Sequence, residues 1–360
     1  LQALKPFARG VAALLDYPMA GATFVLRAAP WPATLGAAAA LGLYLGGVRM
    51  FVGVILGLGF VLASGFWLQG MTTLALVVVS VPLALTFGGA IGVLAHELPR
   101  LRRPVQAVLD IMQTVPTFAY LTPLLVLFGF GPVVGLIASA IYAAPPMARN
   151  ILLGLDRVEP DIREAAIMAG TTRWQQLFLI DLPAARRQIM VGVNQTIMAA
   201  LSMVIIAAVI GGFDDIGWAV LLTMRKADFG NSLIAGLVIV IFAVLIDRMS
   251  AALAADRRGS PAGSLAVLVV GALLAFLLPT PAQDLFTGFA ASANAALGAF
   301  TATHGAGLDA IRNGAMYYGL LPLRIGLDQA VLPMTWGFQW TAAFSMVYLA
   351  AGGLAAGVLA

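Results

Sequence analysis

The chain has 360 residues, of which 61% are hydrophobic and only 10% are charged, and its formal net charge is +4. Soluble domains carry about 25% charged residues, so this composition excludes an ordinary soluble protein and favours a membrane protein. The basic residues lie in loops beside apolar stretches, which indicates membrane topology and not nucleic-acid binding. The sequence has no cysteine, and its two histidines, His96 and His304, lie far apart, so neither disulfides nor a metal site is expected.

Apolar stretches in chain order predict an all-α, polytopic membrane protein. The predicted spans are residues 33–47, 50–67, 71–95, 105–128, 132–152, 187–211, 232–247, 263–279 and 338–360. The first two are short, and they are expected to be tilted, partial or joined. Pro116, Pro123, Pro145 and Pro146 interrupt the fourth and fifth spans. Such breaks are tolerated where neighbouring helices or a water-filled path satisfy the freed carbonyl groups.

Lys and Arg gather in the loops that follow the third, fifth and seventh predicted spans. Because positive charge marks the cytoplasmic side of a membrane protein, these loops should be cytoplasmic. Residues 1–32 would then lie outside. The loop after the fifth span is the longest polar stretch between spans, and it holds residues 159–183.

Residues 159–183 are expected to form two short helices joined by a glycine. Pro160 suits a first helical turn, and Gly170 suits the left-handed conformation that stops a helix. Thr172, with Gln175 three residues later, is typical of a capping box that starts a second helix. Two short helices across a hinge would make a knob that fits a groove on another protein, and the name knob is used below for residues 159–183.

The knob carries a spaced pattern of seven residues, the last of which is a proline expected to end the second helix: Glu164, Ala165, Ala166, Gly170, Ile180, Leu182 and Pro183. This spacing resembles the EAA loop of bacterial ABC importer permeases, which docks onto a cytoplasmic ATPase. An ordinary amphipathic surface loop is the alternative. The ATPase-docking residues that the resemblance implies are Glu164, Ala165, Ala166, Gly170, Thr171, Trp174, Leu182 and Pro183.

Further segments resemble the glycine betaine/proline permeases of the ABC importers, whose membrane domain is of type I, the methionine-permease-like class. They are residues 110–116, 117–120, 144–146, 193–198, 201–204 and 246–248, and the resemblance covers about residues 71–250. It implies paired permease units, ATPase subunits that bind ATP and Mg, and an external substrate-binding protein. Implied substrates are glycine betaine, proline, choline, carnitine or trimethylamine N-oxide, and the implied location is the bacterial inner membrane.

Two similar segments of the chain suggest an internal repeat and thus a second permease unit. Residues 19–48 and 324–353 both run from an amphipathic approach through Pro and Trp into an Ala/Gly-rich span. Two helices that are alike only in composition are the alternative. The expected regions are an external amphipathic segment with peripheral membrane helices (1–70), the core permease domain (71–250), a linker (251–262) and the start of a repeated, fused unit (263–360). A pair formed as a homodimer is the other possibility.

Polar and aromatic residues in the fourth to sixth spans are candidates for a substrate path: Gln113, Phe118, Tyr142, Asn194, Gln195 and Met198. Side-chain amides can hydrogen-bond a carboxylate or an N-oxide, and aromatic rings can accommodate a methylated ammonium group. Phe118 and Tyr142 are therefore expected near the Asn194–Gln195 pair. The alternative is that the amides join helices to one another and that the other residues are packing groups.

No P-loop and no Ser–His–Asp set is visible, so the chain is expected to be a transport subunit without catalysis, cofactor or metal of its own. An ion-coupled secondary transporter is the main alternative, and it would show inverted repeats and buried ionisable groups. A structural or mechanosensing membrane protein would not need the docking loop. The spacing in the knob favours the ABC importer.

Overall fold

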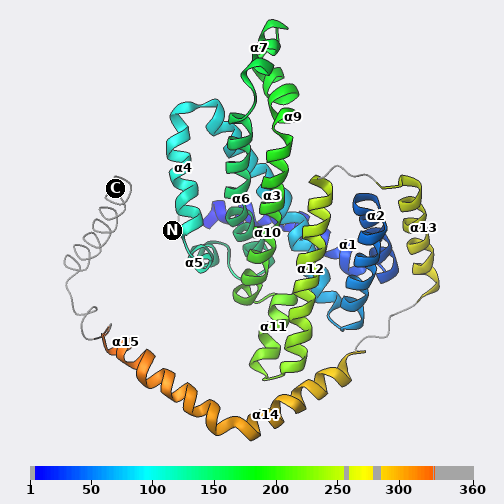
Figure 1. Ribbon diagram of the computed structural model, residues 1–360, viewed down its shortest axis with the longest axis vertical. Helices are drawn as coiled ribbons and strands as arrows, with labels where there is room; N and C mark the ends of the chain where they lie inside the picture. The colour runs from blue at the N-terminus through cyan, green and yellow to red at the C-terminus, as the bar shows by residue number, and fades with distance from the viewer. Residues whose placement is uncertain (1–4, 255–258, 279–284, 327, 329–360) are drawn as a thin grey trace, which may run out of the picture. The chain divides into compact units, whose positions relative to one another are not determined.

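The computed structural model describes residues 5–254, 259–278, 285–326 and 328 (Figure 1). These residues form helices and turns with no strand among them, which confirms the predicted all-α fold class for this part of the chain. The chain divides into two compact units, Leu1–Ala293 and Asn294–Ala360, and each is described by itself.

The first unit contains most of the helices. They are α1 (Lys5–Ala28), α2 (Trp31–Ala63), α3 (Trp67–Glu97), α4 (Pro99–Thr114), α5 (Thr117–Phe128), α6 (Pro132–Asp156), α7 (Pro160–Met168), α8 (Arg173–Gln175), the π-helical turn η2 (Gln176–Asp181), α9 (Leu182–Ala184), α10 (Arg186–Gly211), α11 (Ile216–Arg225), α12 (Phe229–Ala254), α13 (Pro261–Leu277) and the start of α14 (Thr287–Gly314). By length and composition, α2, α3, α6, α10 and α12 could each cross a membrane. The shorter α13 coincides with the predicted span 263–279.

The first two predicted spans are joined in α2, which kinks at Gly47. That residue has φ 69° and ψ −161°, a conformation that glycine adopts without a steric penalty. The kink lets one continuous helix change direction between the two stretches.

The fourth predicted span, residues 105–128, is interrupted at Pro116 as expected. The chain breaks at Val115 and Pro116, and α4 and α5 meet at 108°. Val115 is extended, with φ −69° and ψ 129°, because the ring of a following proline clashes with a helical residue before it. The break therefore follows from the local sequence.

Helices α3, α6 and α10 lie side by side in the bundle (Figure 1). Two glycines on one face of α3 permit its close approach to α6. A Cβ atom built on Gly88 would lie 2.4 Å from the carbonyl oxygen of Ala144, and one built on Gly92 would lie 2.6 Å from that of Ala148. Small residues spaced by four are the usual device for such close packing between membrane helices.

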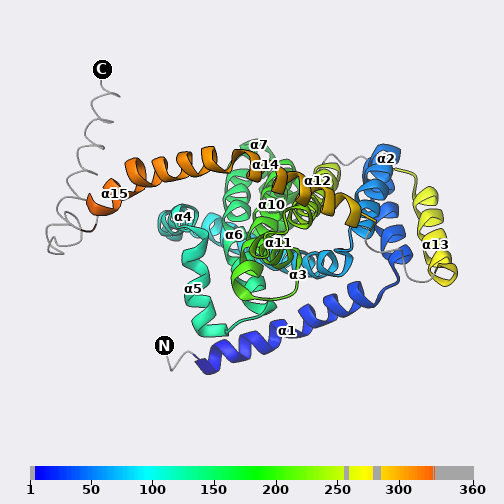
Figure 2. The ribbon, with the colours of Figure 1, turned by 90° about the horizontal axis from the view of Figure 1, so that it is seen from below.

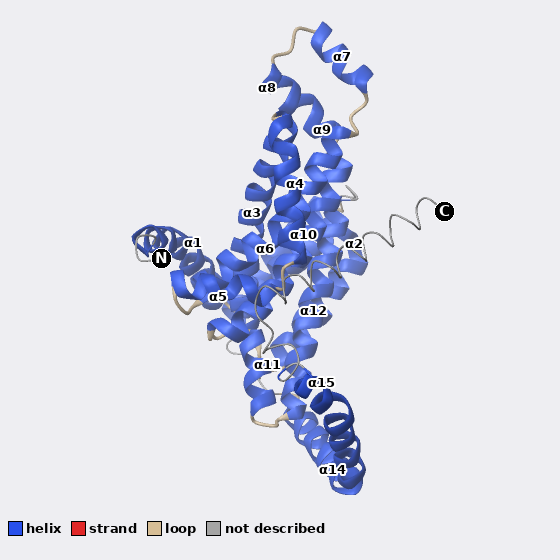
Figure 3. Ribbon diagram, turned by 90° about the vertical axis from the view of Figure 1, so that its left-hand side faces the viewer, coloured by secondary structure: helices blue, strands red, loops and turns tan. Residues whose placement is uncertain are grey.

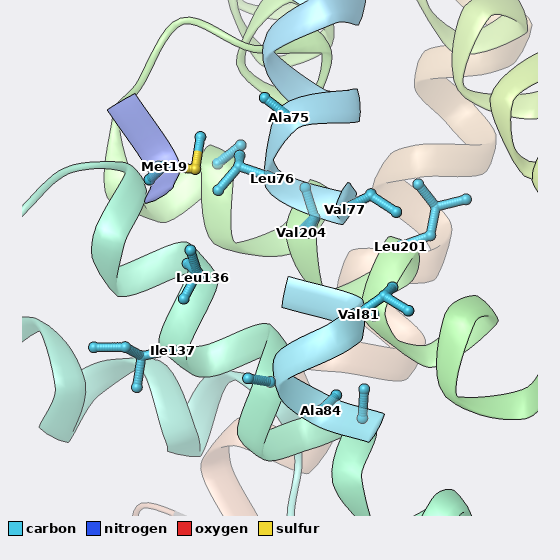
Figure 4. Close-up of a cluster of buried hydrophobic side chains, with 14 of the residues drawn as sticks. Met19, Ala75, Leu76, Val77, Val81, Ala84, Leu136, Ile137, Leu201 and Val204 are labelled. Carbon is cyan, nitrogen blue, oxygen red and sulfur yellow. The ribbon is translucent and has the colours of Figure 1, made fainter. Parts of the chain in front are cut away.

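The largest buried cluster brings four helices together (Figure 4). Leu76 of α3, Leu136 of α6 and Val204 of α10 are all fully buried, and Met19 of α1 packs against this cluster at 2% exposure. Figure 2, which looks along the bundle, shows α1 lying across it. The crosswise α1 covers one side of the bundle core.

The second unit holds the remainder of α14, the π-helical turn η3 (Ala315–Leu320) and α15 (Leu321–Gly326). Phe300 and His304 stack one turn apart on α14, with ring centroids 4.6 Å apart. Most of the predicted repeat at 324–353, and the whole predicted span 338–360, lie outside the described residues.

Candidate functional site

The knob stands at one end of the bundle, with α7 beyond the ends of α3, α6 and α10 (Figure 3). Its first helix ends in a Schellman motif. The N–H of Thr171 donates to the carbonyl of Ala166 at 3.2 Å, and the N–H of Gly170 donates to that of Ile167 at 2.9 Å. Gly170 has φ 76°, so the predicted left-handed stop is confirmed.

The second helix begins with the predicted capping box. The backbone N–H of Gln175 donates to the hydroxyl oxygen of Thr172 at 3.4 Å, and the N–H of Thr172 donates to the side-chain oxygen of Gln175 at 2.8 Å. These two bonds satisfy backbone donors that would otherwise be exposed at the start of the helix.

Pro183 does not end the second helix, contrary to the expectation. The chain continues through η2 and α9 and, after a turn at Ala185, into α10. Proline disrupts a regular α-helix because it lacks an N–H and its ring clashes with the carbonyl four residues earlier. The wider π-helical turn at residues 176–181 relieves that clash, and it joins the knob directly to a candidate membrane span.

A buried ion pair holds the two halves of the knob together. The Nε atom of Arg163 lies 3.1 Å from Oδ1 of Asp181, whose residue is only 4% exposed. The Nη2 atom of Arg163 also donates to the carbonyl of Leu155 at 2.6 Å, so the same guanidinium reaches the end of α6. Sequence reasoning missed this pair because its members are separated by eighteen positions and by the Gly170 turn.

One further ion pair ties the knob to α3, and a second ion pair lies just outside the knob, at the end of α6. Arg173 donates from Nε to Glu97 at the end of α3 at 2.8 Å. Asp156, the last residue of α6, pairs with Arg102 of α4 and lies 3.3 Å from Nδ1 of His96. The knob therefore contacts α3 through an ion pair and α6 through the bond from Arg163 to Leu155, besides its direct connection to α10.

The knob exposes several large apolar side chains, which are called its apolar surface below: Ile167, Met168, Trp174, Phe178 and Leu179, each 56% to 89% exposed. The rings of Trp174 and Phe178 stack with centroids 5.9 Å apart. Of the predicted docking residues, Ala166 is buried, Thr171 and Leu182 are half-buried, and Glu164, Ala165, Gly170, Trp174 and Pro183 are exposed. Ala166 thus contributes to the inside of the knob, whereas Trp174 belongs to its apolar surface.

The amide pair predicted for the substrate path lies in interhelical contacts. Asn194 accepts a hydrogen bond from the hydroxyl of Ser250 in α12. Gln195 accepts one from the side-chain amide of Asn150 in α6 at 2.8 Å, while Gln195 itself remains exposed. Asn150 was not among the sequence candidates, although its position beside the Pro145–Pro146 pair was a usable signal.

The other candidates for the substrate path are scattered. Gln113 and Phe118 are exposed on either side of the α4–α5 break, and Met198 is half-buried on α10. Tyr142 packs against a cluster that contains Leu121. Tyr142 also precedes Asn150 by two turns of α6, about 12 Å along the helix axis, so the structure does not place it beside the amide pair.

Among the described residues no group of three or more potential metal ligands is present. The candidate site is instead the knob at one end of the bundle, together with the hydrogen-bonded amides in the adjoining parts of α6 and α10.

Comparisons with known proteins identify the family of the chain. Residues 80–259 match the family described as binding-protein-dependent transport system inner membrane component. The chain is 38% identical over 254 residues to the glycine betaine/proline betaine transport system permease protein ProW of Escherichia coli, covering 71% of this chain and 72% of that one. It is 39% identical over 259 residues to the trimethylamine N-oxide transport system permease protein TmoV of Ruegeria pomeroyi, covering 69% of this chain and 39% of the relative.

A chain of the MetNI methionine ABC transporter, solved in an inward-facing conformation, aligns with a TM-score of 0.43 at 19% identity, covering 57% of this chain and 92% of the solved one. The family match and the 38% identity carry the assignment by themselves. This chain belongs to the family of binding-protein-dependent transport system inner membrane components, the permeases of ABC importers.

Proposed function

We propose that this chain is the permease of an importer for small methylated amines, driven by a cytoplasmic ATPase that docks on the knob. The observation that carries the proposal is the apolar surface around the stacked Trp174 and Phe178, which a buried ion pair holds in place. Large exposed apolar groups clustered on a rigid, charged support are typical of a protein–protein contact.

The ATPase is proposed to receive the knob in a groove. Trp174 and Phe178 would provide the central apolar contact, and the exposed Glu164 would lie at its polar rim. The links from the knob to α3, α6 and α10 would carry movements of the ATPase into the bundle. ATP and Mg would be bound by that partner, and this chain would hold neither.

The substrate class is inferred from the relatives. Their names specify glycine betaine, proline betaine, carnitine and trimethylamine N-oxide, which share a methylated cationic nitrogen and an anionic oxygen. The exposed Gln195 could hydrogen-bond such an oxygen without carrying a charge of its own. An external binding protein would deliver the substrate and set most of the specificity.

The proposed location is the bacterial inner membrane, with the knob in the cytoplasm and the α10–α11 connection at residues 212–215 outside. The excess of basic residues in the predicted cytoplasmic loops supports this orientation. We further propose that residues 263–360 begin a second permease unit, because residues 19–48 and 324–353 have similar sequence patterns. The family assignment favours ATP-driven import over the ion-coupled alternative.

Uptake of labelled glycine betaine into proteoliposomes that contain the assembled transporter tests the proposal. Uptake should require ATP on the side of the membrane where the ATPase lies, and it should persist when ionophores collapse ion gradients. Excess trimethylamine N-oxide or carnitine should reduce the uptake of labelled glycine betaine. Trp174→Ala combined with Phe178→Ala should abolish it, whereas Leu273→Ala, an exposed apolar residue on α13, should not. Uptake that follows an ion gradient without ATP would overturn the proposal.

A further inference from the structure

Asn150 lies at a close approach between α6 and α10. The residue is 7% exposed, and a Cβ atom built on Gly192 of α10 would lie 2.6 Å from its own Cβ. Its side chain makes three hydrogen bonds. It donates to the carbonyl of Pro146 and to the side chain of Gln195, each at 2.8 Å, and it accepts from Gln188 at 2.6 Å.

These bonds form part of a longer series. The side-chain oxygen of Gln188 accepts from Nη1 of Arg157 at 3.3 Å, and Arg157 lies three residues before the first helix of the knob. Four side chains in sequence, Arg157, Gln188, Asn150 and Gln195, thus connect the base of the knob with an exposed amide on α10. Gln188 and Gln195 are seven residues apart, so the series extends about 10 Å along that helix.

The direction of each bond follows from the partner at Pro146. A backbone carbonyl can only accept, so the Asn150 amide nitrogen must face Pro146 and its oxygen must face Gln188. The same nitrogen donates to Gln195, which must therefore present its oxygen to Asn150. The two N–H donors of Gln195 are then directed away from Asn150, where they suit an anionic oxygen.

We propose that Asn150 is a positioning residue for transport: it orients the exposed Gln195 amide so that its donor end can meet substrate, and it links that orientation to the knob through Gln188 and Arg157. The inference rests on the proposed function, and it deepens that function by naming a residue that couples substrate contact to ATPase movement. The ligand group that Gln195 would meet is a carboxylate or N-oxide oxygen. Asn150 itself touches no substrate.

A purely structural role would appear in the melting temperature and leave the ratio of uptake to ATP hydrolysis unchanged, because amides that join membrane helices contribute to stability. Groups that act in series instead show non-additive effects when two of them are removed together. Gln188→Met and Gln195→Met each remove one bond to Asn150 at nearly constant volume. Ser202→Ala is the matched control, because the Ser202 hydroxyl bonds only within α10, to the carbonyl of Met198 at 3.0 Å.

The test compares the two single variants, the double variant and the control in proteoliposomes that contain the assembled transporter. Substrate uptake, ATP hydrolysis and melting temperature are measured for each. Each single variant should lower the uptake per ATP hydrolysed by roughly 3- to 15-fold while ATP hydrolysis is retained, and the double variant should lose no more than the worse single one. Ser202→Ala should keep the wild-type ratio.

The inference is overturned if the losses of the two single variants in uptake per ATP multiply in the double variant. It is also overturned if the variants lower the melting temperature without changing uptake per ATP. Either outcome leaves the proposed function intact. Wild-type uptake that does not depend on ATP would overturn the proposed function, and the inference with it. Gln195→Glu adds a second measurement. It keeps the acceptor for Asn150 but replaces the donors by an acid, so the KM for a carboxylate substrate should rise with little change in melting temperature.

Discussion

Arg163 and Asp181 form an ion pair that closes the knob on itself, with Nε and Oδ1 3.1 Å apart and the aspartate almost fully buried. Asp181 belongs to the turn that leads into α10, whereas Arg163 belongs to α7 and also reaches the end of α6. The pair therefore fixes the apolar surface of the knob relative to two candidate membrane spans.

Asp181→Leu should destabilise the protein by about 2 kcal/mol, because it leaves the partly buried Arg163 without its charged partner. Arg163→Met combined with Asp181→Leu should be less damaging than Asp181→Leu alone. Thermal unfolding in detergent measures the difference. Arg173→Ala is the control, since its exposed pair with Glu97 should contribute less than about 1 kcal/mol. Equal destabilisation by Asp181→Leu and Arg173→Ala would count against the structural role of the buried pair.

Gly170→Val should weaken ATPase binding, because a β-branched residue resists the left-handed conformation by roughly 1–2 kcal/mol. No atom lies within 4 Å of a Cβ built there, so the effect is conformational and not steric. Gly170→Asn should be milder, since asparagine tolerates this conformation. Gly212→Val is the matched control: Gly212 has φ 66° and equally open space, but it lies between α10 and α11. Pull-down of the ATPase should distinguish the two valine variants, and equal binding by both would argue against docking at the knob.

Gly88→Ala should destabilise the protein by about 1–3 kcal/mol, because the added methyl group would collide with the backbone of α6. Gly89→Ala, one residue along α3, is the control. Its methyl group would meet Ile151 at an ordinary 3.7 Å and would raise helix propensity. The melting temperature should therefore fall in Gly88→Ala and stay the same or rise in Gly89→Ala. A Gly88→Ala variant as stable as Gly89→Ala would contradict the close α3–α6 contact.

Stability should depend on pH through Asp215, the N-cap of α11 in the connection after α10. It accepts hydrogen bonds from the backbone of Trp218 at 3.0 Å and the hydroxyl of Thr73 at 3.3 Å. Burial, with a smaller contribution from Asp214, raises the pKa of this carboxyl to about 7. The folded state thus binds a proton more tightly than the unfolded chain, and that stabilisation is lost as the pH rises through about 7.

The expected loss in the free energy of unfolding is roughly 2–3 kcal/mol between about pH 5 and pH 7. Asp215→Asn keeps a capping oxygen but cannot titrate, so its stability should vary less over the same range. Unfolding measured at a series of pH values compares the two proteins. Identical pH profiles would show that Asp215 is not the responsible group.

The features that sequence analysis predicted correctly are local ones. The stop at Gly170 and the capping box of Thr172 and Gln175 each depend on residues within one or two turns, where backbone geometry decides the outcome. The break at Pro116 is local in the same way, because a proline disfavours the helical conformation of the residue before it, although the 108° angle between α4 and α5 could not be predicted. Pro183 was misjudged because the π-helical turn that accommodates it has no clear sequence signal.

The remaining features depend on contacts between distant segments. The pair of Glu97 with Arg173 and the bond of Asn150 to Gln195 join residues that only the folded bundle brings together. Hydrophobic periodicity shows which residues face other helices but not which helix they meet. Asn194 and Gln195 were therefore singled out from sequence as polar residues in a span, whereas their bonding partners Ser250 and Asn150 were not.

Docking of the knob on a cytoplasmic ATPase is tested most directly by cross-linking from a single cysteine. The chain has no native cysteine, and Met168 is 89% exposed on α7, so Met168→Cys introduces a unique and accessible thiol. In the assembled transporter this thiol should cross-link to the ATPase, and an impermeant reagent should not label it from outside intact cells. Asp214→Cys, in the α10–α11 connection, should give the reverse pattern. Labelling of Met168→Cys from outside, or its failure to cross-link while Asp214→Cys does, would contradict the proposed docking.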